Sequence, residues 1–277
     1  MRWMLIIILG AMLARPGLTM DAAAQACRLF VQSVMPGLLP YMALSQMLVS
    51  RTTSMNPLLL LLLGWGGGSP TGGRLLGMCP DLTTEGRIRL AVCCATMSPM
   101  FLMGTIGQWL ESSTAGVCVL IAVLAGGAAA GALAGMLPRK SGMPISAETP
   151  APLSLGQAVE QTARTLLMVC GTMAVLRVFA ALGTEIMERF FPWLTLPITT
   201  LLEVTTGARE MAALPLPLAW RTALIAGATG FGGMAVIMQN RAVWPRGMLS
   251  LPEQILWQAV HGGASFLISL GIMQMLQ

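Results

Sequence analysis

The sequence predicts an all-α polytopic membrane protein built as an inverted repeat, and three observations carry this prediction. Of the 277 residues, 55% are hydrophobic and only 10% are charged, well below the roughly 25% of charged residues usual in soluble domains. Apolar segments of about 20 residues, the length that crosses a bilayer, recur along the chain. Two other apolar segments are short and end in glycine-rich or polar stretches. We therefore expect about seven spans, two re-entrant hairpins and two discontinuous helices.

The N-terminal part is expected to contribute two spans. The apolar stretch 3–14 has the length of a signal-peptide core, but the small-x-small pattern near Ala14 is poor, so we prefer an uncleaved first span. Residues 28–49 form the second span. Pro36 and Pro40 are expected to kink it, because proline removes an intrahelical hydrogen bond.

A glycine-rich interruption at residues 64–74 follows the short apolar stretch 57–65. Lipid cannot satisfy free backbone N–H and C=O groups, so a break at bilayer depth is tolerated only where protein or a watery cavity surrounds it. Together with the apolar residues 75–79, this region is predicted to be a re-entrant hairpin with a site at its tip.

The rest of the first half contains a broken helix, a span and a linker. Residues 88–110 are long enough to cross the membrane, but Pro99 lies at their centre and predicts a discontinuous helix. Residues 115–137 form a span rich in glycine and alanine, which permits close helix packing. Residues 138–157 are polar and rich in proline, and we expect them to be a cytoplasmic linker.

The second half repeats this order of elements. We expect a span, a short apolar arm, a polar break, a second discontinuous helix interrupted at residues 229–233, and a last span, at residues 159–182, 192–202, 203–210, 219–239 and 254–275. Thr71-Gly72-Gly73-Arg74 matches Thr206-Gly207-Ala208-Arg209, which favours an internal repeat. The predicted organisation is an N-terminal span and connector, a first repeat, the linker and a second repeat, at residues 1–27, 28–137, 138–157 and 158–277.

Each repeat would contain an odd number of crossings, which inverts the second copy relative to the first. Placing Arg51 in the cytoplasm also puts Arg139 and Lys140 there, while the opposite side receives a nearly balanced set of charges. The positive-inside rule then places the N-terminus in the cytoplasm and the C-terminus outside.

Broken elements in an inverted repeat are how many secondary transporters build a site at the membrane midplane. Half-helix N-termini suit carboxylate or phosphate groups, and a guanidinium binds carboxylate in a bidentate manner. We therefore expect Arg74 and Arg209 to bind a small anionic or strongly polar substrate, with ion pairing to a neighbouring acid as the alternative for Arg209. The other candidates supply hydroxyl, amide or backbone groups, although each hydroxyl could instead bond a nearby carbonyl: Gly68, Ser69, Thr71, Gly72, Thr96, Ser98, Thr206, Gly207, Thr229, Gly232 and Gln239.

Glu203 is the candidate for coupling transport to H⁺ or Na⁺, because a carboxylate at membrane depth is costly. An ion pair with Arg209 is the equal alternative. The one histidine, His261, is expected to be packed or to face a lumen. The six cysteines lack metal-ligand spacing, and no Walker loop or catalytic set can be assembled. We thus expect no enzyme, metal site or resident cofactor, and no nucleic-acid partner, since the basic residues are scattered.

Two regions resemble a known family. The residues Gly66-Gly67-Gly68-Ser69-Pro70-Thr71-Gly72-Gly73-Arg74 and the segment that begins Ser98-Pro99-Met100-Phe101 resemble the YlbJ family of sporulation integral membrane proteins, which carry a G-Y-P-x-G-A-like hairpin and S-x-P-x-F-I-x-G-x-V-G. Leu202-Glu203-Val204-Thr205-Thr206-Gly207 is similar to the family's L-E-x-T-x-G. Phe231-Gly232-Gly233 followed by Gln239 is similar to its F-G-G-x-x-x-x-x-Q.

The resemblance implies nucleoside-transporter-like gate repeats and a role in endospore formation. It implies that dipicolinic acid is moved across the mother-cell-derived membrane around the forespore. Our leading hypothesis is a secondary transporter of a small organic anion, with dipicolinic acid first. The alternatives are a non-transporting scaffold of a sporulation complex and a nucleoside-type carrier, and assembly into a homo-oligomer stays open.

Overall fold

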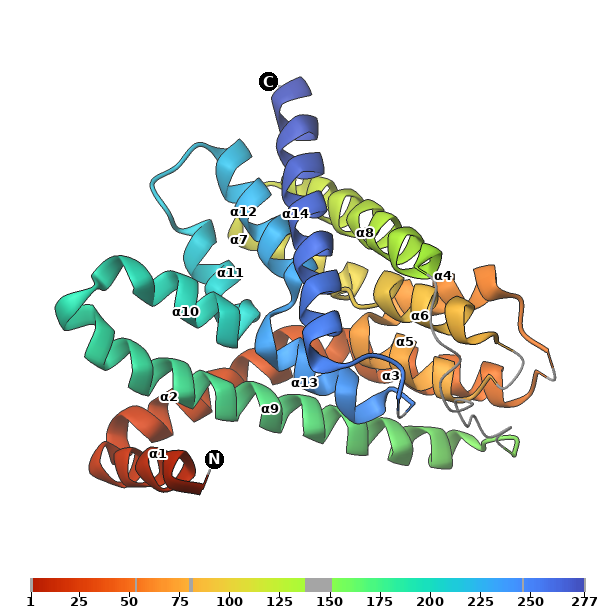
Figure 1. Ribbon diagram of the computed structural model, residues 1–277, viewed down its shortest axis with the longest axis horizontal. Helices are drawn as coiled ribbons and strands as arrows, with labels where there is room; N and C mark the ends of the chain where they lie inside the picture. Colours follow the sequence, from red (N-terminus) through yellow and green to blue (C-terminus); the bar gives the residue numbers. More distant parts are fainter. Residues whose placement is uncertain (1, 53, 80–81, 138–150, 246, 277) are drawn as a thin grey trace.

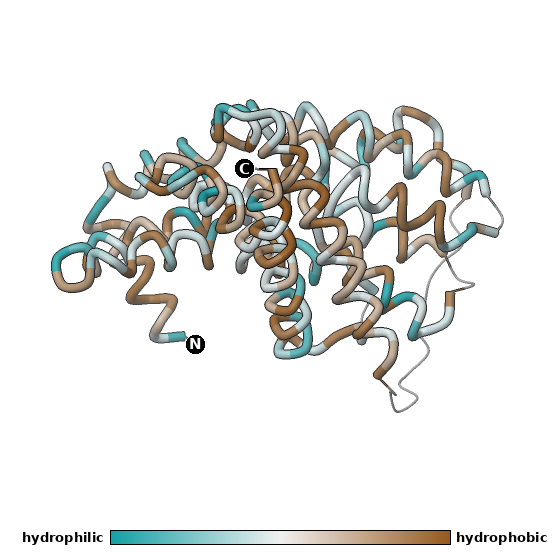
Figure 2. The backbone as a smooth tube through the Cα atoms, turned by 90° about the horizontal axis from the view of Figure 1, so that it is seen from above, coloured by the Kyte–Doolittle hydropathy of each residue, from teal (hydrophilic) through white to brown (hydrophobic). Residues whose placement is uncertain are grey.

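A computed structural model describes residues 2–52, 54–79, 82–137, 151–245 and 247–276. Every regular element in these residues is a helix (Figure 1), which confirms the predicted all-α class. Hydrophobic residues run along helices throughout the molecule (Figure 2). Most of the linker predicted at 138–157 lies outside the described residues, and only its last part, 151–157, is described.

Several helices are long and apolar enough to cross a membrane. Within the described residues there are four of them: Ser113–Met136, Leu155–Phe190, Leu218–Val243 and Leu251–Met275. The helical segments Arg2–Ala14 and Pro16–Ser50 bend by 98° relative to each other and would together make a fifth span.

The second predicted span starts earlier than expected. Helix α2 (Pro16–Leu29), a π-helical segment (Phe30–Val34) and α3 (Met35–Ser50) follow one another without a break. The expected start at residue 28 is wrong, because Pro16 occupies the first turn of α2, where a missing N–H has no cost. The domain boundary expected between residues 27 and 28 therefore falls inside a helix.

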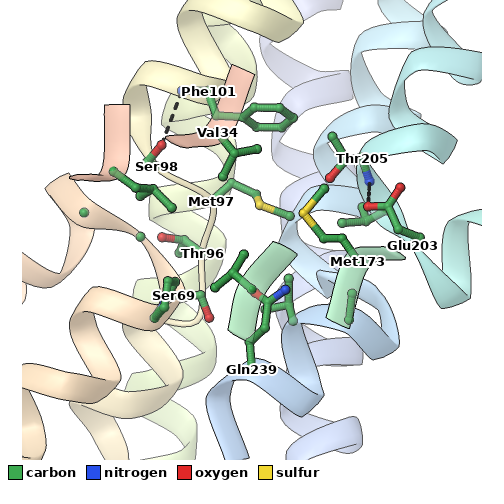
Figure 3. A pocket seen from close by; sticks show the side chains of 18 residues that line it. Val34, Ser69, Thr96, Met97, Ser98, Phe101, Met173, Glu203, Thr205 and Gln239 are labelled. Atoms are coloured by element: carbon green, nitrogen blue, oxygen red, sulfur yellow. Dashed lines mark hydrogen bonds between the residues drawn. The ribbon is translucent and has the colours of Figure 1, made fainter. Parts of the chain in front are cut away.

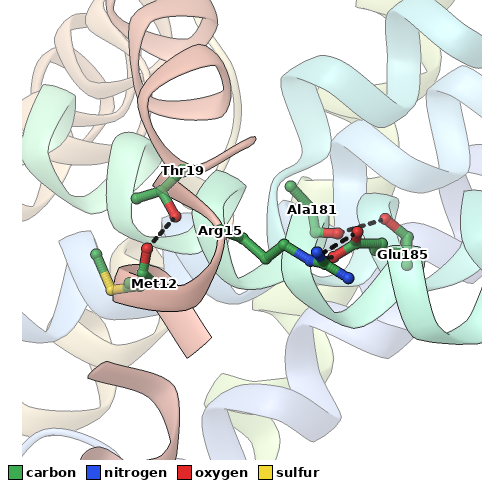
Figure 4. Close-up of polar contacts among 6 residues, drawn as sticks. Met12, Arg15, Thr19, Ala181 and Glu185 are labelled. Atoms are coloured by element: carbon green, nitrogen blue, oxygen red, sulfur yellow. Dashed lines mark hydrogen bonds and ion pairs between the residues drawn. The ribbon is translucent and has the colours of Figure 1, made fainter. Parts of the chain in front are cut away.

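Helix α1 (Arg2–Ala14) lies at the periphery of the molecule (Figure 1) and contains no buried residue. An ion pair of 3.1 Å between Arg15 Nε and Glu185 Oε1 joins the turn after α1 to helix α9 (Leu155–Phe190) (Figure 4). Both side chains are largely exposed, so the pair contributes little to stability.

The first short apolar segment forms a helical hairpin with a break at a single residue. Helix α4 (Pro57–Gly67) and helix α5 (Ser69–Gly77) are separated only by Gly68, whose φ of 73° and ψ of −168° are tolerated by glycine. The expectation that residues 64–74 are unwound is therefore wrong. Their other glycines permit close packing instead, since a Cβ at Gly64 or Gly72 would clash with the side chain of Cys94.

The second half contains a matching hairpin. A short 3₁₀ turn (Pro192–Leu194) leads into α10 (Thr195–Leu202), and α11 (Val204–Ala212) follows after the extended residue Glu203. The predicted break at 203–210 is thus correct in position and too long in extent. Helices α5 and α11 both have nine residues, and Thr71 and Thr206 are the third residue of each.

Both predicted helix discontinuities are present. Helix α6 (Thr84–Cys93) ends before an irregular stretch at 94–99, which is followed by a π-helical segment (Met100–Ile106) and the short α7 (Gly107–Trp109). In the second half, Gly232 adopts a left-handed conformation between α12 (Leu218–Phe231) and α13 (Gly233–Val243).

The long helices form the frame around these broken elements. Helix α14 (Leu251–Met275) packs closely against both α12 and α8 (Ser113–Met136), while α9 packs along α2 and α3. Close approach depends on glycine: a Cβ at Gly126 of α8 or Gly230 of α12 would collide with Ser265 of α14. Helix α5 of the first half contacts α13 of the second, so the two halves meet at the first hairpin.

Candidate functional site

A pocket lies where the broken elements of both halves meet. We call it the central pocket. It is lined by both hairpin tips, by the irregular stretch after α6 and by helix α13. The π-helical segment Phe30–Val34, α3 and α9 complete the lining. Its lining residues include Gly68, Ser69, Thr96, Met97, Ser98, Phe101, Met173, Glu203, Thr205 and Gln239.

Polar groups lie on opposite sides of the central pocket. Ser69 and Thr96 come from the first half, and Glu203 and Thr205 face them from the second (Figure 3). Gln239 is contributed by α13. All five residues are buried, and apolar side chains such as Phe101 and Met173 fill the wall between them. A mostly apolar wall with a few placed polar groups is the usual composition of a small-molecule site.

Glu203 is completely buried and caps its own helix. Its carboxylate accepts hydrogen bonds from the backbone N–H groups of Thr205 (2.9 Å) and Thr206 (2.8 Å). The chain's own carboxylate therefore occupies the N-terminus of α11, where the sequence predicted an external anion. Among the described residues, Glu203 forms no ion pair with Arg209, so the alternative explanation for this acid is also not observed.

The first hairpin tip is tied to both halves. The backbone N–H of Ser69 donates to the carbonyl oxygen of Thr96 at 2.7 Å, and its hydroxyl donates to Oδ1 of Asn240 on α13. No side chain caps α5. Thr96 Oγ1 and Asn240 Nδ2 are buried and have no hydrogen-bond partner among the described residues. Of the two residues only Thr96 lines the pocket, so a bound solute could supply the bond that Thr96 Oγ1 lacks.

The two arginines proposed to bind substrate lie away from this pocket and from each other. Arg74 is partly buried and donates to Gln46 Oε1 of α3 at 3.2 Å and to Gln161 Oε1 of α9 at 3.1 Å. Arg209 is exposed and lines a separate depression beside Glu111. Arg74 and Arg209 each follow the matched threonine by three residues and so occupy equivalent positions of α5 and α11. Neither of these positions lines the central pocket.

The other predicted residues divide between the pocket and local roles. Gly68, Ser69, Thr96, Ser98, Glu203 and Gln239 line the central pocket. The hydroxyls of Thr71 and Thr229 bond carbonyls of their own chain segments, those of Gly67 (3.1 Å) and Ile225 (2.7 Å). Thr206 contributes its N–H to the Glu203 cap. Gly72 and Gly207 allow close helix packing, and Gly232 forms the break after α12.

Several residues near the site carried no recognisable signal in the sequence. Val169 and Met173 line the pocket four residues apart on α9, a spacing that any buried helix face shows. Asn240 follows Gln239 directly. Two neighbouring amide side chains in an otherwise apolar helix are the one sequence feature that could have indicated Asn240. Arg177 lies one turn beyond Met173 within the long apolar helix, where its Nε atom is buried without a partner in the described part of the chain.

Metal-ligating side chains are not gathered anywhere in the described residues. Groups of three or more His, Cys, Asp or Glu side chains that could hold a metal ion are not found there. The six cysteines are free thiols.

The long apolar helices and the pocket define the class of protein: it is a multi-pass integral membrane protein with a buried pocket between two helical hairpins. Comparison of the chain with protein-family models, with curated proteins and with solved structures finds no match.

Proposed function

We propose that this protein is a secondary carrier that moves a small polar organic solute by alternating access. The observation that supports the proposal is the central pocket, whose walls come from both hairpin tips, the stretch after α6 and helix α13. In this proposal the matched hairpins and matched helix breaks are the two copies of an inverted repeat, and rocking of one copy against the other would expose such a site alternately to the two sides of the membrane.

The resemblance to sporulation membrane proteins makes dipicolinic acid, carried across the membrane around the forespore, the first substrate to test. Glu203 is the one ionisable residue that lines the described pocket. Because an ionised carboxylate repels a dianion in a poorly screened site, dipicolinate binding requires Glu203 to take up a proton or a cation to lie between the two. The proposal therefore includes coupling to H⁺ or Na⁺ at Glu203.

A neutral, nucleoside-type solute is the second candidate, and the charge of the lining favours it. Gln239, Thr96 and Ser69 offer amide and hydroxyl groups, Glu203 accepts hydrogen bonds, and Phe101 provides an aromatic face. No arginine or lysine of the described residues lines this pocket. A nucleoside would satisfy these groups without any compensating charge.

Counterflow in proteoliposomes tests the carrier proposal and separates the two substrates. Vesicles that contain the purified protein and unlabelled solute should accumulate external labelled dipicolinate, or a labelled nucleoside such as uridine, and excess of the true substrate should abolish the signal. Gln239→Ala should reduce this exchange at least tenfold. Gln108→Ala, in the short helix α7 and outside the pocket lining, is the matched control and should exchange like the unchanged protein.

Neutralisation of Arg74 and Arg209 tests the prediction from the sequence that these two side chains bind the substrate. Arg74→Gln and Arg209→Gln should each retain substrate affinity, because neither side chain lines the pocket. A large loss of substrate affinity in both variants, at normal protein levels, would show that the two arginines do bind substrate. Absence of exchange for every solute, together with normal spore dipicolinate in cells that carry Gln239→Ala, would favour the scaffold alternative.

A further inference from the structure

A second polar region lies inside the molecule on helix α14. Gln254, Gln258, His261, Ser265 and Ser269 follow one another at helical spacing, so they share one face, and none is more than 2% exposed. This face points at α8 and α12, the two helices that pack most closely on α14. Polar side chains inside a membrane-spanning helix are costly and usually functional.

Three of these side chains line a narrow, closed gap between helices, with Val92, Ala95, Trp244, Leu249 and Trp257 as its other walls. Four of their polar atoms have no hydrogen-bond partner among the described residues: Gln254 Oε1, Gln258 Oε1, Gln258 Nε2 and His261 Nδ1. Buried polar atoms in this number normally have water or a ligand as a partner. Because most of them are acceptors, the chemistry matches water or hydronium.

The protonation of His261 follows from its neighbour on α8. Its Nε2 atom lies 2.8 Å from the carbonyl oxygen of Val123. Since a carbonyl oxygen only accepts hydrogen bonds, Nε2 carries the hydrogen, and in the neutral ring Nδ1 is then a free lone pair. The fold thus holds one proton-accepting nitrogen in the buried interior.

This cavity lies between the central pocket and the surface. Ala95 lines it, and the next residue, Thr96, lines the central pocket with its hydroxyl oxygen unpartnered in the described structure. At the other end, Trp244 and Leu249 also line a surface pocket next to Arg241. Shared or adjacent lining residues therefore make the three spaces neighbours, from the pocket beside Trp244 and Leu249 to the pocket of Glu203.

We propose that the cavity of Gln254, Gln258 and His261 is a proton relay that links the surface to the central pocket, an inference that rests on the carrier function proposed above. Hydronium entering from the surface gives its proton to His261 Nδ1 and becomes water. The imidazolium then passes a proton through water and the Thr96 hydroxyl to the Glu203 carboxylate, which becomes the neutral acid. The two glutamines orient the water.

The relay is closed in this conformation. The lining side chains leave no room for a water molecule to settle between them, so protons move only when α14 and the residues opposite it separate. Such closure prevents a leak of protons without solute. Helix α8 faces His261 with Val123 and Gly127. The titratable residue Cys93 of α6 packs against Gly127 and Gly131 of α8. Glu253 and Arg241 stand at the surface end.

Simultaneous measurement of solute and proton movement tests the relay. Proteoliposomes that contain the pH dye pyranine and the purified full-length protein are given a solute that supports counterflow. His261→Gln keeps a donor for the Val123 carbonyl but binds no proton near neutral pH. It should lose uphill accumulation driven by a pH gradient, with at least a tenfold fall in protons moved per solute, while counterflow stays within about twofold.

Ser269→Ala is the matched control, since it lies on the same face of α14 outside the cavity, and it should move protons normally. Leucine is similar in size to glutamine, and Gln258→Leu should lose proton coupling as His261→Gln does. It replaces His261→Gln in the test if that variant does not fold. Unchanged proton coupling in either folded variant would overturn the relay, as would a lack of uphill accumulation driven by the pH gradient in an unchanged protein that carries out counterflow. Absence of counterflow in the unchanged protein would instead reject the carrier function itself.

Discussion

Arg87 shows how one charged side chain is accommodated in the apolar interior. It is 1% exposed, and its guanidinium donates to the carbonyl oxygens of Leu76, Cys79 (2.8 Å) and Leu82 (3.4 Å). These carbonyls lie at and just after the end of α5, where the helix dipole is negative. The arginine therefore holds the second arm of the first hairpin in place.

Replacing Arg87 should destabilise the protein strongly. Arg87→Met leaves buried carbonyl groups without donors, and two such groups would cost about 2–4 kcal/mol. Thermal unfolding in detergent should show a clearly lower midpoint. Arg89→Met, two residues along α6 and exposed, is the control and should change stability by no more than about 0.5 kcal/mol. Equal midpoints for both variants would contradict the capping role.

The proposed coupling at Glu203 predicts that transport depends on pH. If its carboxylate must be neutral for dipicolinate to bind, uptake should rise as the pH falls, because protonation removes the repulsion. Glu203→Gln has no charge at any pH and should make uptake independent of pH while one oxygen still caps α11. Glu188→Gln, at an exposed position of α9 outside the central pocket, is the control and should keep the pH profile of the unchanged protein. A persistent pH profile in Glu203→Gln would assign coupling elsewhere.

Among the helices and hairpins, the sharpest local requirement is the break at Gly68. Its positive φ is unfavourable for any residue with a side chain, and an added Cβ would lie 2.8 Å from the backbone nitrogen of Ser98. We expect Gly68→Ala to cost about 1–3 kcal/mol from strain alone and to lower the unfolding midpoint.

Gly77→Ala is the matched control for Gly68→Ala, since Gly77 lies at the end of α5, the helix that Gly68 precedes, with open space around it. It should be neutral or stabilising by roughly 0.5–1 kcal/mol, because alanine is the better helix former. A Gly68→Ala protein as stable as the control would show that the hairpin tolerates another tip conformation.

The extent of each helical break illustrates the limit of local reasoning. The glycine run before Ser69 correctly located the tip, but glycine also serves where helices touch, and these two uses look the same in a sequence. Packing of Gly64 and Gly72 against Cys94 shows that most of the run belongs to helices.

For the molecule as a whole, the packing of α2 along α9 is a long-range contact that a simple experiment can check. Cys27 Sγ and Cys170 Sγ lie 3.8 Å apart although 143 residues separate them. Mild oxidation with iodine should join the two peptides by a disulfide, which mass spectrometry detects. Cys27→Ser should abolish the link. Its absence in the folded, unchanged protein would mean that these helices are not neighbours.

Amino-acid order alone determined the membrane class, the sequence of elements and the positions of the hairpin tips and helix breaks, since hydropathy, proline and glycine act over a few neighbouring residues. It also singled out six residues of the central pocket. Packing between distant elements determined which side chains meet: Arg74 reaches glutamines on α3 and α9, Glu203 caps its own helix, and Ser69 bonds Asn240. The direction of a side chain around its helix depends on what packs against that helix, and no local pattern contains that information.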